Sequence, residues 1–141
     1  MIELRKITLI LGYSVFGKRG MADRISEQEQ CIVELYPEAH LHPVYHADIA
    51  ERYMQVVRED QGRKIVSVTD SENLILRLRR RIAEGVLDPN HVIAWWAGPP
   101  ADPRPIVFCQ EGWPDWWPDG LYDATFKEVA ALQRARIRCV E

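Results

Sequence analysis

The sequence predicts an α/β fold with a short, mostly parallel sheet flanked by helices. Short apolar runs alternate with polar, helix-permissive segments along the 141 residues, which is the pattern of a parallel sheet with crossover helices. The composition, 47% hydrophobic and 28% charged, is that of a globular protein. The length suits one domain, and neither a repeat nor a linker interrupts it, so we expect a single domain spanning 1–141.

The predicted strands are residues 6–11, 31–35, 64–68, 91–96 and 105–109. The first is an apolar run that Gly12 ends, and the third follows a break at Gln61-Gly62-Arg63. The last two flank a Gly/Pro-rich turn at 98–103 and are therefore expected to form a hairpin.

The predicted helices are residues 21–30, 43–60, 69–84 and 122–136. The second begins at Pro43, which suits a first helical turn, and apolar residues then recur every three or four positions. Thr69 and Glu72 form a candidate capping box for the third helix, which Gly85 ends. Residues 111–120, rich in Trp, Pro and Gly, precede the last helix as a loop.

Bulk properties exclude some function classes. The net charge of −3 provides no overall basic field to attract nucleic acid. Three widely spaced cysteines without a Cys-x-x-Cys pair indicate a reduced, cytoplasmic protein. The N-terminal apolar run is too short for a signal peptide, and no apolar stretch is long enough to span a membrane.

The first predicted strand leads into Gly12-x4-Gly17-Lys18, followed by Arg19. This is the phosphate-loop pattern, in which backbone N–H groups and the lysine hold phosphates, while a final Ser or Thr binds Mg²⁺. Arg19 occupies that final position. The pattern therefore predicts nucleotide phosphate binding at Gly12, Gly17, Lys18 and Arg19, with no side chain for Mg²⁺.

Three later segments carry a resemblance to a known family. They are Glu34-Leu35-Tyr36-Pro37-Glu38-Ala39-His40-Leu41-His42-Pro43, the stretch from Lys64 through Thr69-Asp70-Ser71-Glu72, and Trp117-Pro118-Asp119-Gly120-Leu121-Tyr122-Asp123. In this order they resemble the Walker B region, the switch-histidine region and the C-terminal segment of ABC-type P-loop ATPases. The similarity is to the branch that includes the overcoming-lysogenisation-defect proteins, and it covers roughly residues 5–20 and 31–135.

The departures from that family concern the chemistry of hydrolysis. Leu35 stands where the resemblance places the Mg²⁺-ordering acid, Tyr36 where it places the catalytic glutamate, and Asp70 where it places the switch histidine. About 15 residues replace the long stretch that carries the helical lobe and signature motif in such ATPases. Because phosphoryl transfer depends on the metal and on a positioned base, we expect the chain to be catalytically impaired.

The resemblance therefore implies a reduced, degenerate ATPase-like core. It retains residual ATP binding, without a dependable Mg²⁺ site, and acts through association. The alternative is an active ATP-hydrolysing enzyme that has recruited Glu34 or Glu38 as acid or base. A shortened remnant without a selected role is a further alternative.

Arg77, Arg79, Arg80 and Arg81 form a dense basic cluster. One interpretation is a nucleic-acid-binding accessory protein that uses this helix. The other is a solvated helix face whose arginines pair with glutamates at helical spacing.

Two other clusters favour structural interpretations. His40, His42 and His46 have a superficially metal-like spacing, but no fourth ligand is evident and no metal site is predicted. Trp95 and Trp96 are adjacent on a strand, so one ring is expected to face inward and the other outward, toward core or interface.

Association is expected because a core without its helical lobe should expose apolar surface that needs covering. The expected partners are a second copy of the chain, giving a homo-oligomer, or a complete partner ATPase.

Overall fold

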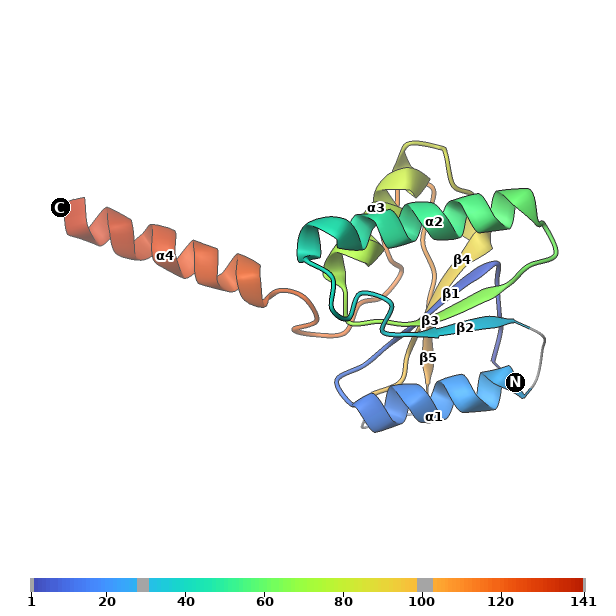
Figure 1. The fold of residues 1–141 in the computed structure, drawn as a ribbon. Helices are drawn as coiled ribbons and strands as arrows, with labels where there is room; N and C mark the ends of the chain where they lie inside the picture. The colour runs from blue at the N-terminus through green and yellow to red at the C-terminus, as the bar shows by residue number, and fades with distance from the viewer. Residues whose placement is uncertain (1, 28–30, 99–102, 141) are drawn as a thin grey trace.

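The computed structural model describes residues 2–27, 31–98 and 103–140, and it confirms the predicted α/β class. One sheet has the strand order β2-β3-β1-β4-β5 (Figure 1). The first four strands in this order pair in parallel, and β5 pairs antiparallel with β4. The strands are β1 (Ile7–Leu11), β2 (Ile32–Leu35), β3 (Ile65–Val68), β4 (Val92–Trp96) and β5 (Arg104–Ile106).

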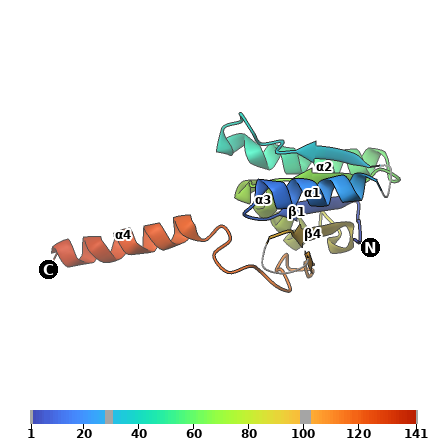
Figure 2. The same ribbon diagram turned by 90° about the horizontal axis from the view of Figure 1, so that it is seen from below.

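Helices cover both faces of the sheet, with α1 on one face and α2 and α3 on the other (Figures 1 and 2). The helices are α1 (Val15–Ser26), α2 (His46–Glu59), α3 (Glu72–Ala83) and α4 (Ala124–Val140), with single 3-10 turns η1 (Pro43–Tyr45) and η2 (Pro89–His91). Both faces of β1 are buried, as expected for the central strand of a parallel sheet.

Two apolar clusters form the core. Under α1, Met21 and Ile25 pack on the sheet with Ile10, Val66 and Ile93. The other cluster lies between the sheet and the pair α2–α3. Its members include Leu9, Ile49, Tyr53, Met54, Leu74, Leu78, Ile82 and Trp96. The central strands are thus fixed from both sides, which holds their ends in place.

All four helix starts differ from the sequence prediction: α2 begins at His46, after the turn η1, α4 begins at Ala124, and α1 and α3 differ through their caps. The helix expected from residue 21 begins at Val15, because the Ser14 side chain accepts a hydrogen bond from the Gly17 N–H and caps the helix. Gly17 and Lys18 therefore lie in the first turns of α1 and not in a loop; the expected end at 28–30 lies outside the described residues. The cap of α3 is Ser71, which accepts from the Leu74 N–H at 3.1 Å, and not Thr69.

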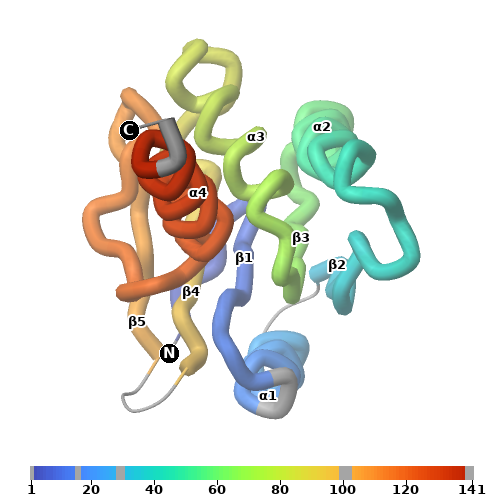
Figure 3. Tube along the Cα trace, turned by 90° about the vertical axis from the view of Figure 1, so that its left-hand side faces the viewer, coloured from blue at the N-terminus to red at the C-terminus, as the bar shows by residue number. Residues whose placement is uncertain are grey.

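The hairpin is confirmed, although its second strand is shorter than predicted. β5 ends at Ile106, because the next segment pairs with a different partner: Phe108 bridges to Pro114 across a turn that contains Gly112 at φ +81°. Much of the expected turn at 98–103 lies outside the described residues. The last helix is longer than expected, reaching Val140, and it projects away from the body (Figures 1 and 2); Figure 3 views it nearly end-on, in front of the body. Among the described residues, no helix has the length and apolar character needed to cross a bilayer.

Candidate functional site at the carboxyl edge of the sheet

The residues singled out in three separate sequence segments meet at one edge of the sheet. Gly12 follows β1, Tyr36 follows β2, and Asp70 follows β3 by two residues. The three strands are parallel, so their carboxyl ends lie side by side. This edge is where open α/β sheets bind their ligands.

Lys18 extends from α1 into this edge, and its ammonium group already has an ion-pair partner within the chain. The side chain is only 2% exposed, and its Nζ forms an ion pair with the Asp70 carboxylate, which is 57% exposed. The same Nζ lies 5.0 Å from the centre of the Tyr36 ring, a cation–π contact. A buried charge needs such partners, and both come from positions where the resemblance places catalytic side chains.

Glu38 anchors the position of Asp70. One carboxylate oxygen of Glu38 accepts a hydrogen bond from the Asp70 N–H at 2.7 Å. Its other oxygen, Oε2, is buried and has no hydrogen-bond partner among the described residues, and the same is true of the Tyr36 hydroxyl. Burial raises the pKa of the Tyr122 hydroxyl, and the negative charges of Asp70, Glu38 and Glu72 raise it further. Asp70, Glu38 and Glu72 thus bring negative charge to the edge where the Lys18 ammonium group is buried.

The segment before α4 contacts the turn after β1. The Tyr13 hydroxyl donates to the Asp119 carbonyl at 2.9 Å, and the Tyr13 ring meets Trp96 edge-on at 4.8 Å between centroids. Gly120, at φ +80°, makes the turn beside the Tyr13 hydroxyl that brings the chain back toward Tyr122. Residues 117–122 therefore pack against this edge of the sheet.

The four predicted phosphate-binding residues lie together, but not as a loop. The turn between β1 and α1 spans only residues 12–14. Gly17 allows α1 to approach the end of β4, since a Cβ there would lie 3.1 Å from the Ala97 carbonyl oxygen. Arg19 is exposed to solvent. Because the turn is short, few backbone N–H groups are in position to surround a phosphate.

Of the two acids considered for the enzyme alternative, Glu34 points toward α2. Its carboxylate accepts two hydrogen bonds from Arg52, both at 2.8 Å, and one from the Tyr53 hydroxyl at 2.6 Å. These donors hold the pKa of Glu34 below its usual value. Glu38 lies at the same edge as Asp70 and accepts a hydrogen bond from its backbone N–H.

The arginines of α3 have partners within the molecule. Arg77 and Arg81 both bind the Glu51 carboxylate, at 3.0 and 2.7 Å, and Arg80 pairs with Glu84. Arg79 donates to the Gly112 carbonyl and lies over the Trp113 ring. This arrangement favours the interpretation of a paired helix face, and nucleic-acid binding stays an untested prediction.

The histidines also have structural contacts. His46 bridges the Leu41 carbonyl and the Ser71 hydroxyl through its two ring nitrogens, and His42 accepts from the Val44 N–H. Among the described residues, no group of three or more His, Cys, Asp or Glu side chains is arranged to hold a metal.

Both adjacent tryptophans are buried. Trp96 packs in the α2–α3 core and Trp95 in the core under α1, where its Nε1 donates to the Glu3 carbonyl. The expected outward ring is covered because both faces of the sheet carry helices. Trp113, which is 66% exposed, is the tryptophan that faces solvent.

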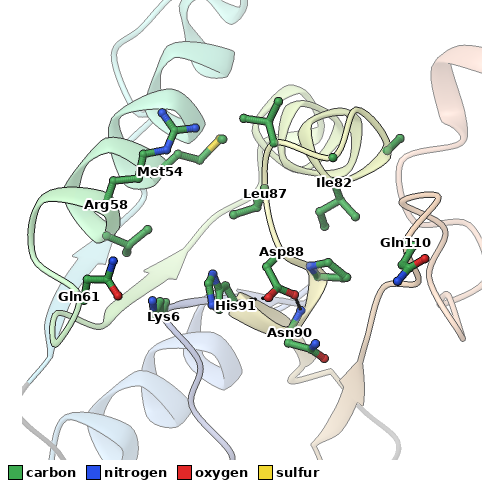
Figure 4. A pocket seen from close by; sticks show the side chains of 15 residues that line it. Lys6, Met54, Arg58, Gln61, Ile82, Leu87, Asp88, Asn90, His91 and Gln110 are labelled. Atoms are coloured by element: carbon green, nitrogen blue, oxygen red, sulfur yellow. Dashed lines mark hydrogen bonds and ion pairs between the residues drawn. The ribbon is translucent and has the colours of Figure 1, made fainter.

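A cavity of about 730 Å³ lies at the opposite, amino edge of the sheet, away from Lys18 (Figure 4). It is lined by the polar side chains of Lys6, Arg58, Asp88 and His91, together with apolar residues of α2 and α3. The carboxyl-terminal ends of both helices face this edge, and cations there offset the negative ends of the helix dipoles. The helix dipoles therefore account for the positively charged side chains that line the cavity.

The sequence did not predict the contacts that occupy Lys18 and close this edge of the sheet. It placed Asp70 at the switch-histidine position but did not identify it as the partner of Lys18, and it did not name Tyr13 or Tyr122 as site residues. Lys18 and Asp70 are 52 positions apart, so no local pattern signals their contact, and only the strand order brings the two residues together. In comparisons with known protein families, curated proteins and solved structures, the chain has no significant match.

Proposed function

We propose that this chain is a degenerate P-loop ATPase-like domain, impaired in hydrolysis, that retains weak ATP binding and acts through association. The observation that carries the proposal is the ion pair between the buried Lys18 ammonium and the Asp70 carboxylate. A phosphate that uses Lys18 has to displace this carboxylate, so ATP competes with an acid built into the chain.

The chemistry of the surrounding positions supports impaired hydrolysis. Leu35 supplies no oxygen for Mg²⁺ or its waters. Tyr36 is in contact with Lys18 through its ring, and its hydroxyl is buried, so it does not take the place of a carboxylate base. Arg19 remains exposed and supplies a positive charge for a phosphate that reaches this edge.

Calorimetric titration with ATP, with and without Mg²⁺, tests the proposal. We expect the wild-type protein to bind ATP weakly, with a dissociation constant of about 1 mM, and without dependence on Mg²⁺. Asp70→Asn releases Lys18 for a charge-assisted hydrogen bond to phosphate and should tighten binding about tenfold. Lys18→Ala should abolish the binding, whereas Lys6→Ala, which removes a lysine at the opposite, amino edge of the sheet, should not change it.

Two results would overturn the proposal. ATP turnover that requires Mg²⁺ and is lost on Lys18→Ala would establish the enzyme alternative. Absence of ATP binding in Asp70→Asn, with the fold intact by circular dichroism, would show that the edge does not bind nucleotide even with Lys18 released.

A further inference from the structure

Helix α4 stands apart from the rest of the molecule. It leaves the body after residue 123 and points into solvent, as two perpendicular views show (Figures 1 and 2). From Ala124 to Arg138 the described residues are all exposed except Ala130, which is half-buried. Phe126 is 76% exposed and Ile137 63% exposed.

A solitary helix of this length is marginally stable in water. Nucleation is costly, and most helical stability in proteins comes from packing an apolar face. The 17 residues of α4 include Thr125, Val129 and Ile137, whose β-branched side chains lower helix propensity. The helix therefore needs a packing partner that its own body does not supply.

Four apolar residues of α4 form one stripe, and the exposed Leu132 lies outside it. Phe126, Val129, Ala130 and Ile137 recur at spacings of three, four and seven residues, which places them along one side of the helix. Lys127, Arg134 and Arg138 lie next to one another on an adjacent side, since they are separated by seven and four residues.

Charge is distributed unequally along α4. At its base, Asp119, Asp123 and Glu128 are acidic, and the single cation there, Lys127, already pairs with Asp123 at 2.9 Å. The acids that act on Tyr122, which precedes the helix by two residues, are Asp70, Glu38 and Glu72. The distal half carries three arginines and no acid within the helix: Arg134, Arg136 and Arg138.

We propose that α4 pairs with α4 of a second copy of this chain in an antiparallel arrangement. The arginines of each distal half then lie beside the acidic base of the other copy, while the two apolar stripes face each other. A parallel pair would bring six arginines together and is disfavoured by like-charge repulsion. The helix is about 25 Å long, so each distal half reaches the base of the other.

This inference names the partner for the association part of the proposed function, but it does not depend on nucleotide binding. A pair of helices of this length gives a small interface, so we expect a dissociation constant in the range of about 1–50 µM.

Sedimentation equilibrium over a concentration series tests the pairing. We expect the wild-type protein to dimerise. The double substitution Phe126→Asp/Ile137→Asp should weaken the dimer by about a hundredfold, because each side chain contributes about tenfold when buried. Val44→Asp, at an apolar residue that is also exposed but lies on the body, is the matched control and should leave the dimer unchanged. Since all three side chains are exposed, the fold should survive, and circular dichroism verifies this.

Charge reversal and spin labels test the orientation. Arg134→Glu/Arg138→Glu alone should weaken dimerisation about tenfold by placing acids beside the acidic base. In the antiparallel pair, nitroxide labels at position 131 lie close to each other, and labels at position 125 lie far apart, near opposite ends of the pair.

A monomer at 100 µM would overturn the proposal, as would a dimer that tolerates Phe126→Asp/Ile137→Asp or labels at position 125 that are as close as those at 131. A monomer that binds anionic vesicles through α4 would also overturn it in favour of a membrane surface. None of these results bears on ATP binding, so failure of this inference and failure of the nucleotide proposal are distinguishable.

Discussion

Individual side chains decide what the candidate site is able to bind. Lys18 matches the lysine of a phosphate loop, yet its charge is directed to Asp70, a residue of the same chain. Burying an ammonium group is costly unless a group of opposite charge lies beside it. A phosphate-loop pattern in a sequence therefore need not leave its lysine without a partner in the same chain.

Glu34 shows a second effect at this scale, the dependence of stability on pH. Its pKa is lowered from the ordinary value of 4.5, chiefly by the hydrogen bonds from Arg52 and Tyr53. A lowered folded-state pKa gives stability that is present above pH 4.5 and is lost as the pH falls through the folded-state pKa.

Replacing Glu34 by Gln should therefore lower the free energy of unfolding by about 1–2 kcal/mol at pH 7 and by less at pH 3. Urea unfolding at a series of pH values measures both quantities. Glu111→Gln is the control, because Glu111 is exposed on a loop and should show no such change. An equal loss at pH 7 and pH 3 would contradict the assigned role of the carboxylate charge.

At the scale of elements, backbone conformation sets where helices begin and how loops close. Because Ser14 caps α1, the helix begins at Val15, and the second half of the predicted phosphate loop is helical. In the loop after β5, Gly112 is required because its φ is positive and its α-carbon packs against α3. A Cβ there would lie 2.4 Å from the Arg79 carbonyl oxygen.

Two glycine substitutions should therefore have opposite effects on the free energy of unfolding. Gly112→Ala should destabilise the protein by roughly 1–3 kcal/mol, through an unfavourable φ and a clash with the backbone of α3. Gly20→Ala, inside α1 and without a neighbour within 4 Å, should stabilise it by about 0.5–1 kcal/mol. Thermal and urea unfolding measure both; a stabilising Gly112→Ala would refute the required conformation.

At the scale of the whole molecule, the structure consists of a packed body and an unpacked arm. The sheet is covered on both faces, so its central strands should open only with global unfolding. Helix α4 has no such cover in the monomer. Its stability should therefore depend on whatever it docks against.

Hydrogen exchange should reveal this difference. We expect the amides of α4 to exchange rapidly at 0.5 µM protein and more slowly at 100 µM, where the proposed dimer forms. The amides of β1 serve as the internal control and should exchange slowly at both concentrations. Strong α4 protection at 0.5 µM, equal to that of β1, would contradict the view of α4 as an unpacked arm.

The sequence by itself determined the α/β class, the position of most elements and the residues of interest at the ends of β1, β2 and β3. These follow from local information: apolar periodicity, glycine and proline breaks, and capping residues. Strand alternation explains why Glu34 points toward α2, because a shift of one residue reverses the face of a side chain.

Only the tertiary structure decided that Lys18 pairs with Asp70, that residues 117–122 pack on the same edge and that α4 stands free. Each depends on which strands are neighbours or on how the chain turns after the sheet is complete. Such contacts join residues 50 or more positions apart, as between Tyr13 and Asp119, and no local pattern encodes them. The free energy of the packed core, and not local propensity, selects these contacts.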